Sequence, residues 1–240
     1  MDDESRQDLA QRMSILALRL QDEDNRADTL RVISHTAADL VPGTTWAGIS
    51  LIEGRRVTVE APTHSLVIEI EHLQKDLGDG PTLSAIQQQR IIGVPDFTKP
   101  DQPWPTFADR AVELGVRAML SLPLAVHREI LGSLNLYAAE SDAFTYSETI
   151  AELVARHAAI ALAGVTHAHH LTAALINRDV LGQAKGILMQ RDGLTAPQAF
   201  EQLVRLSQNS NIKVADVAHQ LVTDTENHAS DDHRRGSATG

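Results

Sequence analysis

The order of apolar and polar residues along the chain predicts two parts of different character. Between residue 30 and about residue 140, some segments alternate apolar and polar residues as strands do, and others repeat apolar residues at helical spacing. From Ser147 onward the spacing is helical, and no proline occurs before Pro197. The sequence therefore predicts an α+β domain followed by a helical domain.

Two pairs of apolar runs in the first part, each joined by a short polar turn, predict β-hairpins. The runs are Trp46–Ile52 with Val57–Val59, and Ala118–Val126 with Ile130–Ala138. Helical spacing and turn residues predict the other elements, which are helices over 6–20, 30–40, 65–76 and 83–89, a helix ending at Leu114, and a strand over 91–94. This order predicts a mostly antiparallel sheet flanked by helices.

The second part predicts three helices and a tail. One long helix runs from residue 147 to about residue 190 and is stopped by Gly193. A capping box in Thr195–Gln198 begins the next helix, and Val214, Val217, Ala218 and Leu221 share one face of a third. The residues from 225 to 240 are polar and lack periodicity, which predicts a disordered tail.

Apolar residues of the long helix also fit a heptad repeat, the pattern of a parallel coiled-coil dimer. Polar or small residues such as His157 and Lys185 interrupt it. The heptad positions are Ile150, Leu153, Ile160, Leu171, Leu181 and Leu188. The contacts that we expect in a homodimer are Leu153, Ile160, Leu171 and Leu175.

Composition restricts the chemistry and the compartment. The chain has no cysteine, which excludes disulfides, zinc–thiolate sites and cysteine nucleophiles. No uninterrupted apolar run approaches the ~20 residues needed to span a bilayer. The acidic N-terminus, Met1-Asp2-Asp3-Glu4, is the reverse of the basic start of a signal peptide. We therefore expect a cytoplasmic protein with no membrane segment.

The net charge of −11 disfavours broad binding to nucleic acid, because neutralising phosphates requires lysine and arginine. Acidic residues, however, are concentrated in the first 30 positions. Between residues 171 and 222 five cations face four acids, so this segment is nearly neutral and is compatible with local binding to RNA. The five cations are Arg178, Lys185, Arg191, Arg205 and Lys213.

The segment Leu171–Met189, with the sequence LTAALINRDVLGQAKGILM, resembles the first helix of ANTAR domains. The resemblance extends through residue 222 and includes Ala199–Leu203, Ser207-Gln208 and Val217-Ala218. It implies a protein that binds a pair of short hairpins with six-nucleotide loops in nascent RNA. That binding prevents an overlapping terminator from forming.

Upstream motifs resemble the GAF sensor domain that often precedes ANTAR in actinobacteria. They are Gly78–Pro81, Trp104-Pro105, Leu114–Arg117, Leu120–Leu124 and Leu131–Leu136. Such relatives often have cysteine after the Gly-Pro pair, but this chain has Thr82, which excludes thiol-based sensing there. The implied organisation is an acidic helix over 1–24, a GAF domain over 25–165, an ANTAR domain over 166–224 and a disordered tail over 225–240.

Together the resemblance and the charges predict RNA contacts from cations and amides of the ANTAR-like segment. Arg178 and Lys185 are seven residues apart and share a helix face; alternatively, their stems cover the core while their charges reach water. Arg191 also suits the C-terminal dipole of its helix. The predicted contacts are Arg178, Gln183, Lys185, Arg191, Arg205, Gln208 and Lys213.

Several residues are expected to be structural instead. Phe200 begins an apolar stripe and is predicted to lie in the core rather than to stack on a base. Small residues, namely Ala184, Gly186 and Ala199, are expected to permit close helix packing. The cluster His167, His169 and His170 has no carboxylate at ligand spacing, so no metal site is predicted.

Three hypotheses remain for the function. The first is a homodimeric, RNA-binding antitermination regulator whose GAF domain acts through the long helix. The second treats residues 195–222 as a DNA-binding helix-turn-helix, although Lys213 is followed by Asp216. The third is a signalling adaptor that binds proteins. No catalytic motif is found and no cofactor is predicted; a small-molecule effector near Asp96–Phe107 and a degenerate, ligand-free sensor are both compatible with the sequence.

Overall fold

The computed structural model describes residues 11, 13, 14, 16, 20, 25–54, 56–127 and 129–236, and only the backbone of residues 169–176, 226 and 228–236. The chain divides into two compact units, Met1–His167 and Ala168–Gly240, and each is described by itself. The first unit is an antiparallel sheet with helices and the second is helical, which confirms the α+β prediction.

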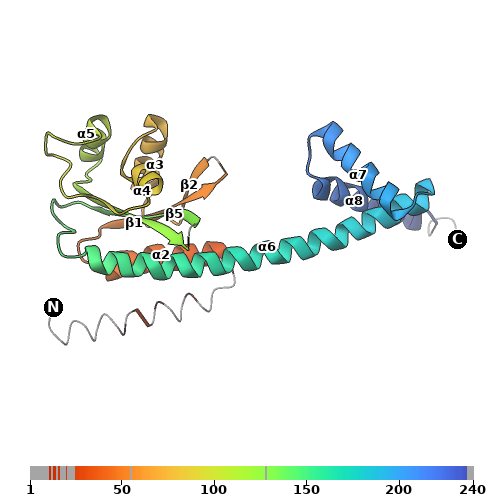
Figure 1. The fold of residues 1–240 in the computed structure, drawn as a ribbon, viewed down its shortest axis with the longest axis horizontal. Coiled ribbons are helices and arrows are strands. Elements are labelled where there is room, and N and C mark those ends of the chain that lie inside the picture. Colours follow the sequence, from red (N-terminus) through yellow and green to blue (C-terminus); the bar gives the residue numbers. More distant parts are fainter. Residues whose placement is uncertain are drawn as a thin grey trace. The chain divides into compact units, whose positions relative to one another are not determined.

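The sheet of the first unit has five strands in the order β2-β1-β5-β4-β3 (Figure 1). All neighbouring strands are antiparallel. The strands are β1 (Trp46–Glu53), β2 (Arg56–Glu60), β3 (Ile92–Val94), β4 (Ala118–Val126) and β5 (Glu129–Ala138). Both predicted hairpins and the predicted short strand are therefore confirmed. The pairing of β1 with β5, which lie far apart in the sequence, closes the centre of the sheet.

Helices cover both faces of this sheet (Figure 1). One face carries α2 (Arg26–Leu40) and the first part of α6 (Glu148–Asp192), and the other carries α3 (Ser65–Leu77), α4 (Pro81–Gln88) and α5 (Pro105–Glu113). Because side chains alternate along a strand, β5 directs Leu134 and Leu136 into the core shared with α2 and α6. Tyr137 lies in the separate core beneath α3 and α5.

The N-terminal segment belongs in part to the first of these cores. Met13, Leu16 and Leu20 are helical and buried among the residues that pack with α2 and α6. Most of the acidic helix predicted over 1–24 lies outside the described residues. The three buried side chains recur at helical spacing, as the sequence predicts.

The first 21 residues of α6, Glu148–Ala168, are long and apolar enough to cross a membrane by length and composition. The sequence predicts no such segment, because charges at Glu152 and Arg156 interrupt the apolar run. These two charges nevertheless leave the mean hydropathy of the segment high. The residues of α6 that are buried in the core are Ala151, Val154, Ala155, Ala158, Ala159 and Leu162. This face of the segment packs inside the first unit.

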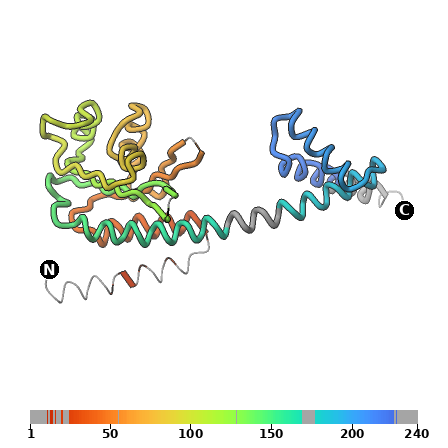
Figure 2. Tube along the Cα trace, viewed as in Figure 1, coloured from red at the N-terminus to blue at the C-terminus, as the bar shows by residue number. Residues whose placement is uncertain are grey.

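The second unit consists of the end of α6, α7 (Ala196–Ser210) and α8 (Val214–Gly236), joined by short turns (Figure 2). The three predicted helices are thus confirmed. α8 continues to Gly236, which differs from the disordered tail expected from residue 225. The physical reason is that no glycine or proline occurs between Val214, where α8 begins, and Gly236, so no helix-breaking residue interrupts it.

Candidate nucleic-acid interface

A small core holds the second unit together. Its fully buried side chains come from all three helices and are Ala184, Leu188, Ala199, Leu203 and Ala218. Three of the five are alanines, which let the helix axes approach closely, as expected for Ala184 and Ala199. Gly186 does not share this role, since a Cβ there would meet no atom within 4 Å. Gly186 faces outward because it lies on the side of α6 opposite Ala184 and Leu188.

Local signals fix both ends of α7. Thr195 and Gln198 form the predicted capping box, in which the Thr195 N–H donates to Gln198 Oε1 at 2.9 Å. At the other end Asn211 adopts the left-handed conformation with φ 55°, and Ser207 Oγ donates to the Ile212 carbonyl at 2.5 Å. The turn places Lys213 directly before α8.

Most of the predicted RNA-contacting side chains are exposed and unpaired. Lys185 is half-buried, while the cations Arg178, Arg205 and Lys213 and the amides Gln183 and Gln208 are exposed. Among the described residues, none of these four cations forms an ion pair with a carboxylate. Their charges are therefore directed to solvent and remain available to an anionic partner.

Arg191 is the exception among the predicted contacts. Its Nε and Nη2 donate to the two carboxylate oxygens of Asp192 at 2.8 and 3.0 Å. Gln202 Nε2 also donates to Asp192 at 3.4 Å, which links α7 to the end of α6. The hydrogen bonds from Arg191 lower the pKa of Asp192 below its ordinary value. Because its guanidinium is already paired, Arg191 offers less charge to RNA than Arg178 or Lys185.

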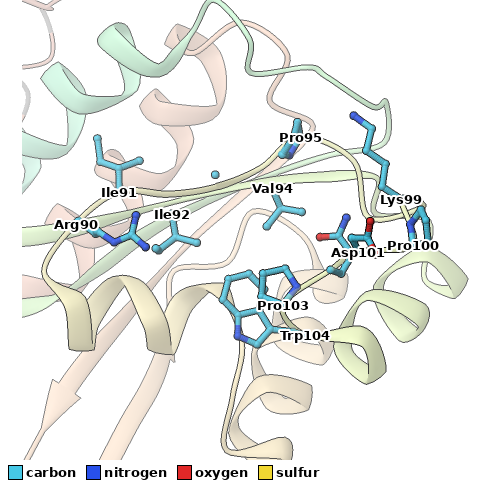
Figure 3. A pocket seen from close by; sticks show the side chains of 12 residues that line it. Arg90, Ile91, Ile92, Val94, Pro95, Lys99, Pro100, Asp101, Pro103 and Trp104 are labelled. Atoms are coloured by element: carbon cyan, nitrogen blue, oxygen red, sulfur yellow. The ribbon is translucent and has the colours of Figure 1, made fainter.

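The first unit has a cavity of about 540 Å³ between the edge strand β3 and the loop that follows it (Figure 3). Ile92 and Val94 lie on one side and Pro103 and Trp104 on the other. Two cations, Arg90 and Lys99, also line the cavity, together with Ile91, Gly93, Pro95, Pro100, Asp101 and Gln102. Much of the stretch predicted to surround an effector therefore borders this cavity.

Hydrogen bonds hold the loop around the cavity. The Thr98 side chain and backbone N–H both donate to the Asp96 carboxylate, at 2.7 and 2.9 Å, and this lowers the pKa of Asp96. Gln102 Nε2 donates to the Asp96 carbonyl at 2.7 Å. These contacts shape one wall of the cavity, while the Lys99 ammonium lies 3.9 Å from the Asp142 carboxylate and Arg90 Nε donates to Gln88 Oε1 at 2.8 Å.

A second polar feature of the first unit was not predicted. The carboxyl of Glu71, on α3, is buried between this helix, α4 and the sheet. It accepts hydrogen bonds from Ser50, Gln74, Thr82 and Tyr137. A signal for it exists in the sequence, because Val67, Ile70, Glu71 and Gln74 share one helix face and so place a carboxyl within an apolar stripe.

Comparison with known families identifies both units. The family model of the ANTAR domain matches residues 169–222, and that of the GAF domain matches residues 23–163. The chain belongs to the GAF domain family and carries an ANTAR domain at its C-terminal end. This is the architecture of a sensor-regulator rather than of an enzyme. No curated protein matches the chain significantly in sequence.

Solved structures agree with the GAF fold. The phytochrome photosensory core module of Stigmatella aurantiaca is 14% identical, with a TM-score of 0.57 over 86% of this chain and 46% of that chain. The GAF domain of the cyanobacteriochrome TePixJ is 15% identical, with a TM-score of 0.52 over 62% and 95%. The reduced form of fRMsr of Staphylococcus aureus is 16% identical, with a TM-score of 0.50 over 64% and 94%. At these identities the likeness concerns the fold alone.

One expectation about the ANTAR domain is wrong. Phe200 is not in its core, since 47% of its surface is exposed. The physical reason is that Ala199 and Leu203 fill the contact with the other two helices, and Phe200 is rotated by about 60° from Leu203 around α7. An aromatic ring at this position is accessible to a partner.

The predicted dimer contacts are placed differently from one another. Leu153 is partly buried against the core of the GAF domain and therefore has partners within its own chain. Ile160 is 66% exposed. The side chains of Leu171 and Leu175 lie outside the described residues. Ile160 is thus the described heptad position that best fits a contact with a second chain.

No group of three or more histidine, aspartate and glutamate side chains in the described part of the chain is suited to hold a metal ion. His167 is exposed on α6. The side chains of His169 and His170 lie outside the described residues. The prediction that the three histidines form no metal site therefore stays a prediction.

Proposed function

We propose that this protein is a homodimeric, RNA-binding antitermination regulator, in which the ANTAR domain binds paired hexaloop hairpins in nascent mRNA. The observation that carries the proposal is the set of unpaired cations around the small ANTAR core. Arg178, Lys185, Arg205 and Lys213 form no ion pair with a carboxylate of the described chain. Because nascent bacterial mRNA is made in the cytoplasm, a protein that binds it would act there.

Hairpin loops suit such a surface better than duplexes do. The bases of an A-form duplex face a groove too deep and narrow for side chains, whereas loop bases are unstacked and accessible. Lysine and arginine can hold the loop phosphates, and amides such as Gln183 and Gln208 can bond base edges. The overall acidity of the chain then limits binding to RNA that engages this local set.

The GAF domain supplies the sensory part of the proposal. The cavity beside β3 has the size of a small-molecule site, an aromatic wall at Trp104, and cations at Arg90 and Lys99. A small-molecule effector with an anionic group would match this lining. Such a ligand controls the ANTAR domain only if it binds one arrangement of the protein more tightly than another.

Dimerisation yields a prediction at Ile160. Replacing it by glutamate places a charge on the exposed heptad face of α6, and we expect the dimer to dissociate at concentrations where the wild type remains paired. Sedimentation velocity measures the change. The matched control is Ile68→Glu, which alters an exposed apolar residue of α3 and should leave the dimer intact. A dimer that survives Ile160→Glu would remove this face from the interface.

A transcription assay tests the proposed activity. The template carries a leader with two hexaloop hairpins, the second overlapping a terminator, and RNA polymerase is supplied with or without the protein. We expect the protein to raise the fraction of full-length transcript. A template in which the loop bases are changed but the stems are kept is the control. Equal read-through on both templates would refute antitermination through loop recognition.

A further inference from the structure

The interior of the GAF domain contains a carboxyl held by donors from four different elements. Ser50 Oγ of β1 donates to Glu71 Oε2 at 2.7 Å. Gln74 Nε2 of α3 and Thr82 Oγ1 of α4 donate to Oε1 at 3.0 and 2.8 Å, and the hydroxyl of Tyr137 on β5 donates to the same oxygen. This arrangement joins two helices to the two central strands.

Tight backbone packing supports the same cluster. Gln74 Oε1 accepts from the Thr82 backbone N–H at 2.8 Å, directly after Gly80 and Pro81. Gly80 has a positive φ of 145°, and a Cβ there would overlap the Gln74 side chain. Gly80 of the Gly-Asp-Gly-Pro motif is therefore required, because a side chain there would prevent α4 from approaching Gln74. Gln74 in turn contacts Glu71.

With all four donors directed at Glu71, three other polar atoms are left without partners. Ser121 Oγ, Ser133 Oγ and Asn135 Oδ1 are buried and make no hydrogen bond. The sheet register pairs Ser121 with Asn135, and Ser133 lies two residues from Asn135 on the same face of β5. Unpaired buried polar atoms are rare and costly, so an arrangement that supplies Asn135 Oδ1 with a donor is favoured.

Ser50 and Asn135 can adopt a second pattern of hydrogen bonds. Asn135 Nδ2 now donates to Ser50 Oγ at 3.1 Å. If the Asn135 amide turns over, its oxygen takes the place of Nδ2 beside Ser50 Oγ and can accept a hydrogen bond from it. Ser50 Oγ is then free to accept a hydrogen bond, and the group that can donate it is a protonated Glu71. In this second pattern Asn135 Oδ1, which now has no partner, accepts from Ser50.

We propose that Glu71 is a proton-operated latch: uptake of a proton by its carboxyl reverses the hydrogen bonds through Ser50 and Asn135 and, by removing the negative charge, weakens the charge-assisted hydrogen bonds that Oε1 accepts from α4 and β5. The proton resides on Oε2 and comes from solvent. β5 carries Asn135 and Tyr137 on this face and Leu134 and Leu136 on the face that packs with α6. The latch therefore acts on β5, the strand whose other face packs against α6.

The electrostatic surroundings favour the protonated form. Burial raises the pKa of Glu71 above its ordinary value, although the hydrogen bonds from Tyr137, Ser50, Thr82 and Gln74 oppose this. Ser50, Gln74, Thr82 and Asn135 do not titrate. Tyr137 is the titratable neighbour, and burial and the charge of Glu71 raise its pKa well above the ordinary value, so it remains a donor. No basic side chain of the described residues pairs with Glu71.

Stability as a function of pH tests the latch. A carboxyl whose pKa is higher in the folded than in the unfolded protein stabilises the fold at low pH, and this contribution is lost as pH rises through the folded pKa. We expect the melting temperature of Glu71→Gln, followed by the fluorescence of Trp46 and Trp104, to rise relative to wild type as pH increases from about 5 to about 8. Glu69→Gln, an exposed control on α3, should show no such change. A constant difference between Glu71→Gln and wild type would overturn the proposal.

Infrared spectroscopy gives a readout that does not depend on the stability of a variant. The wild-type protein should show the carbonyl stretch of a protonated carboxylic acid at pH values where exposed glutamates are ionised. Asn135→Leu removes the partner of Ser50 in both patterns, so the pH at which this band disappears should shift. Absence of the band in the wild type, or an unchanged midpoint in Asn135→Leu, would contradict the latch.

Discussion

Replacing Arg178 and Lys185 together by alanine is expected to weaken binding to a paired-hairpin RNA by roughly 100-fold or more. A hydrogen bond to a charged group contributes about 1.5–3 kcal/mol, so the loss of two corresponds to at least ~3 kcal/mol. Neither side chain is fully buried, and both lie outside the buried core of the ANTAR domain, so the fold should be retained. Titration of labelled RNA, with circular dichroism to verify the helices, measures the effect.

Salt dependence separates phosphate contacts from other causes of weak binding. Each phosphate contact to single-stranded RNA contributes about −0.7 to the slope of log affinity against log salt, so the double variant should lose about 1.4 from the slope. Lys75→Ala, which removes an exposed cation of the GAF domain, is the matched control and should leave affinity and slope unchanged. An unaltered slope in the double variant would show that Arg178 and Lys185 do not contact phosphate.

Leu203→Ala is expected to unfold the ANTAR domain while the GAF domain stays folded. Leu203 is fully buried, and Leu188 is the other fully buried leucine among the described residues of this core. Truncation of a buried leucine costs about 2–5 kcal/mol, a large fraction of the stability of so small a unit. RNA binding should disappear with the fold.

Two signals separate the domains in this experiment. Both tryptophans, Trp46 and Trp104, belong to the GAF domain, so fluorescence follows that domain alone while circular dichroism follows all helices. Leu203→Ala should lose helical signal at low temperature with an unchanged fluorescence transition. The control is Leu206→Ala on the same helix, whose side chain is 45% exposed and whose loss should change stability little. Equal effects of the two variants would argue against the described core.

Much of the fold could be predicted because its signals are local. Alternation in Ala118–Val126 and Glu129–Ala138 and the Thr195–Gln198 capping box each depend on neighbouring residues. The pairing of β1 with β5 could not be derived in the same way, since it joins residues about ninety positions apart. The order of the elements supplied the expectation of a mostly antiparallel sheet, but that order does not specify which strands pair.

The surroundings of Phe200 and Glu71 were not predicted correctly, because both depend on contacts between segments that are distant in the sequence. Phe200 has the spacing of a core residue, but three helices bury only a narrow stripe of α7, and the sequence does not state how wide that stripe is. The burial of Glu71 was not predicted, because a carboxyl within an apolar stripe is stable only with donors from Ser50, Thr82 and Tyr137. These donors come from distant segments. Such partners become visible only in three dimensions.

Equilibrium binding of the full-length wild-type protein to an RNA that carries two adjacent hexaloop hairpins tests directly whether the ANTAR domain recognises paired RNA loops. We expect tighter binding to this RNA than to a single hairpin, because two linked domains engage two loops, and little competition by duplex DNA. Affinity that is equal for all three nucleic acids, or absent even at low salt, would contradict this expectation.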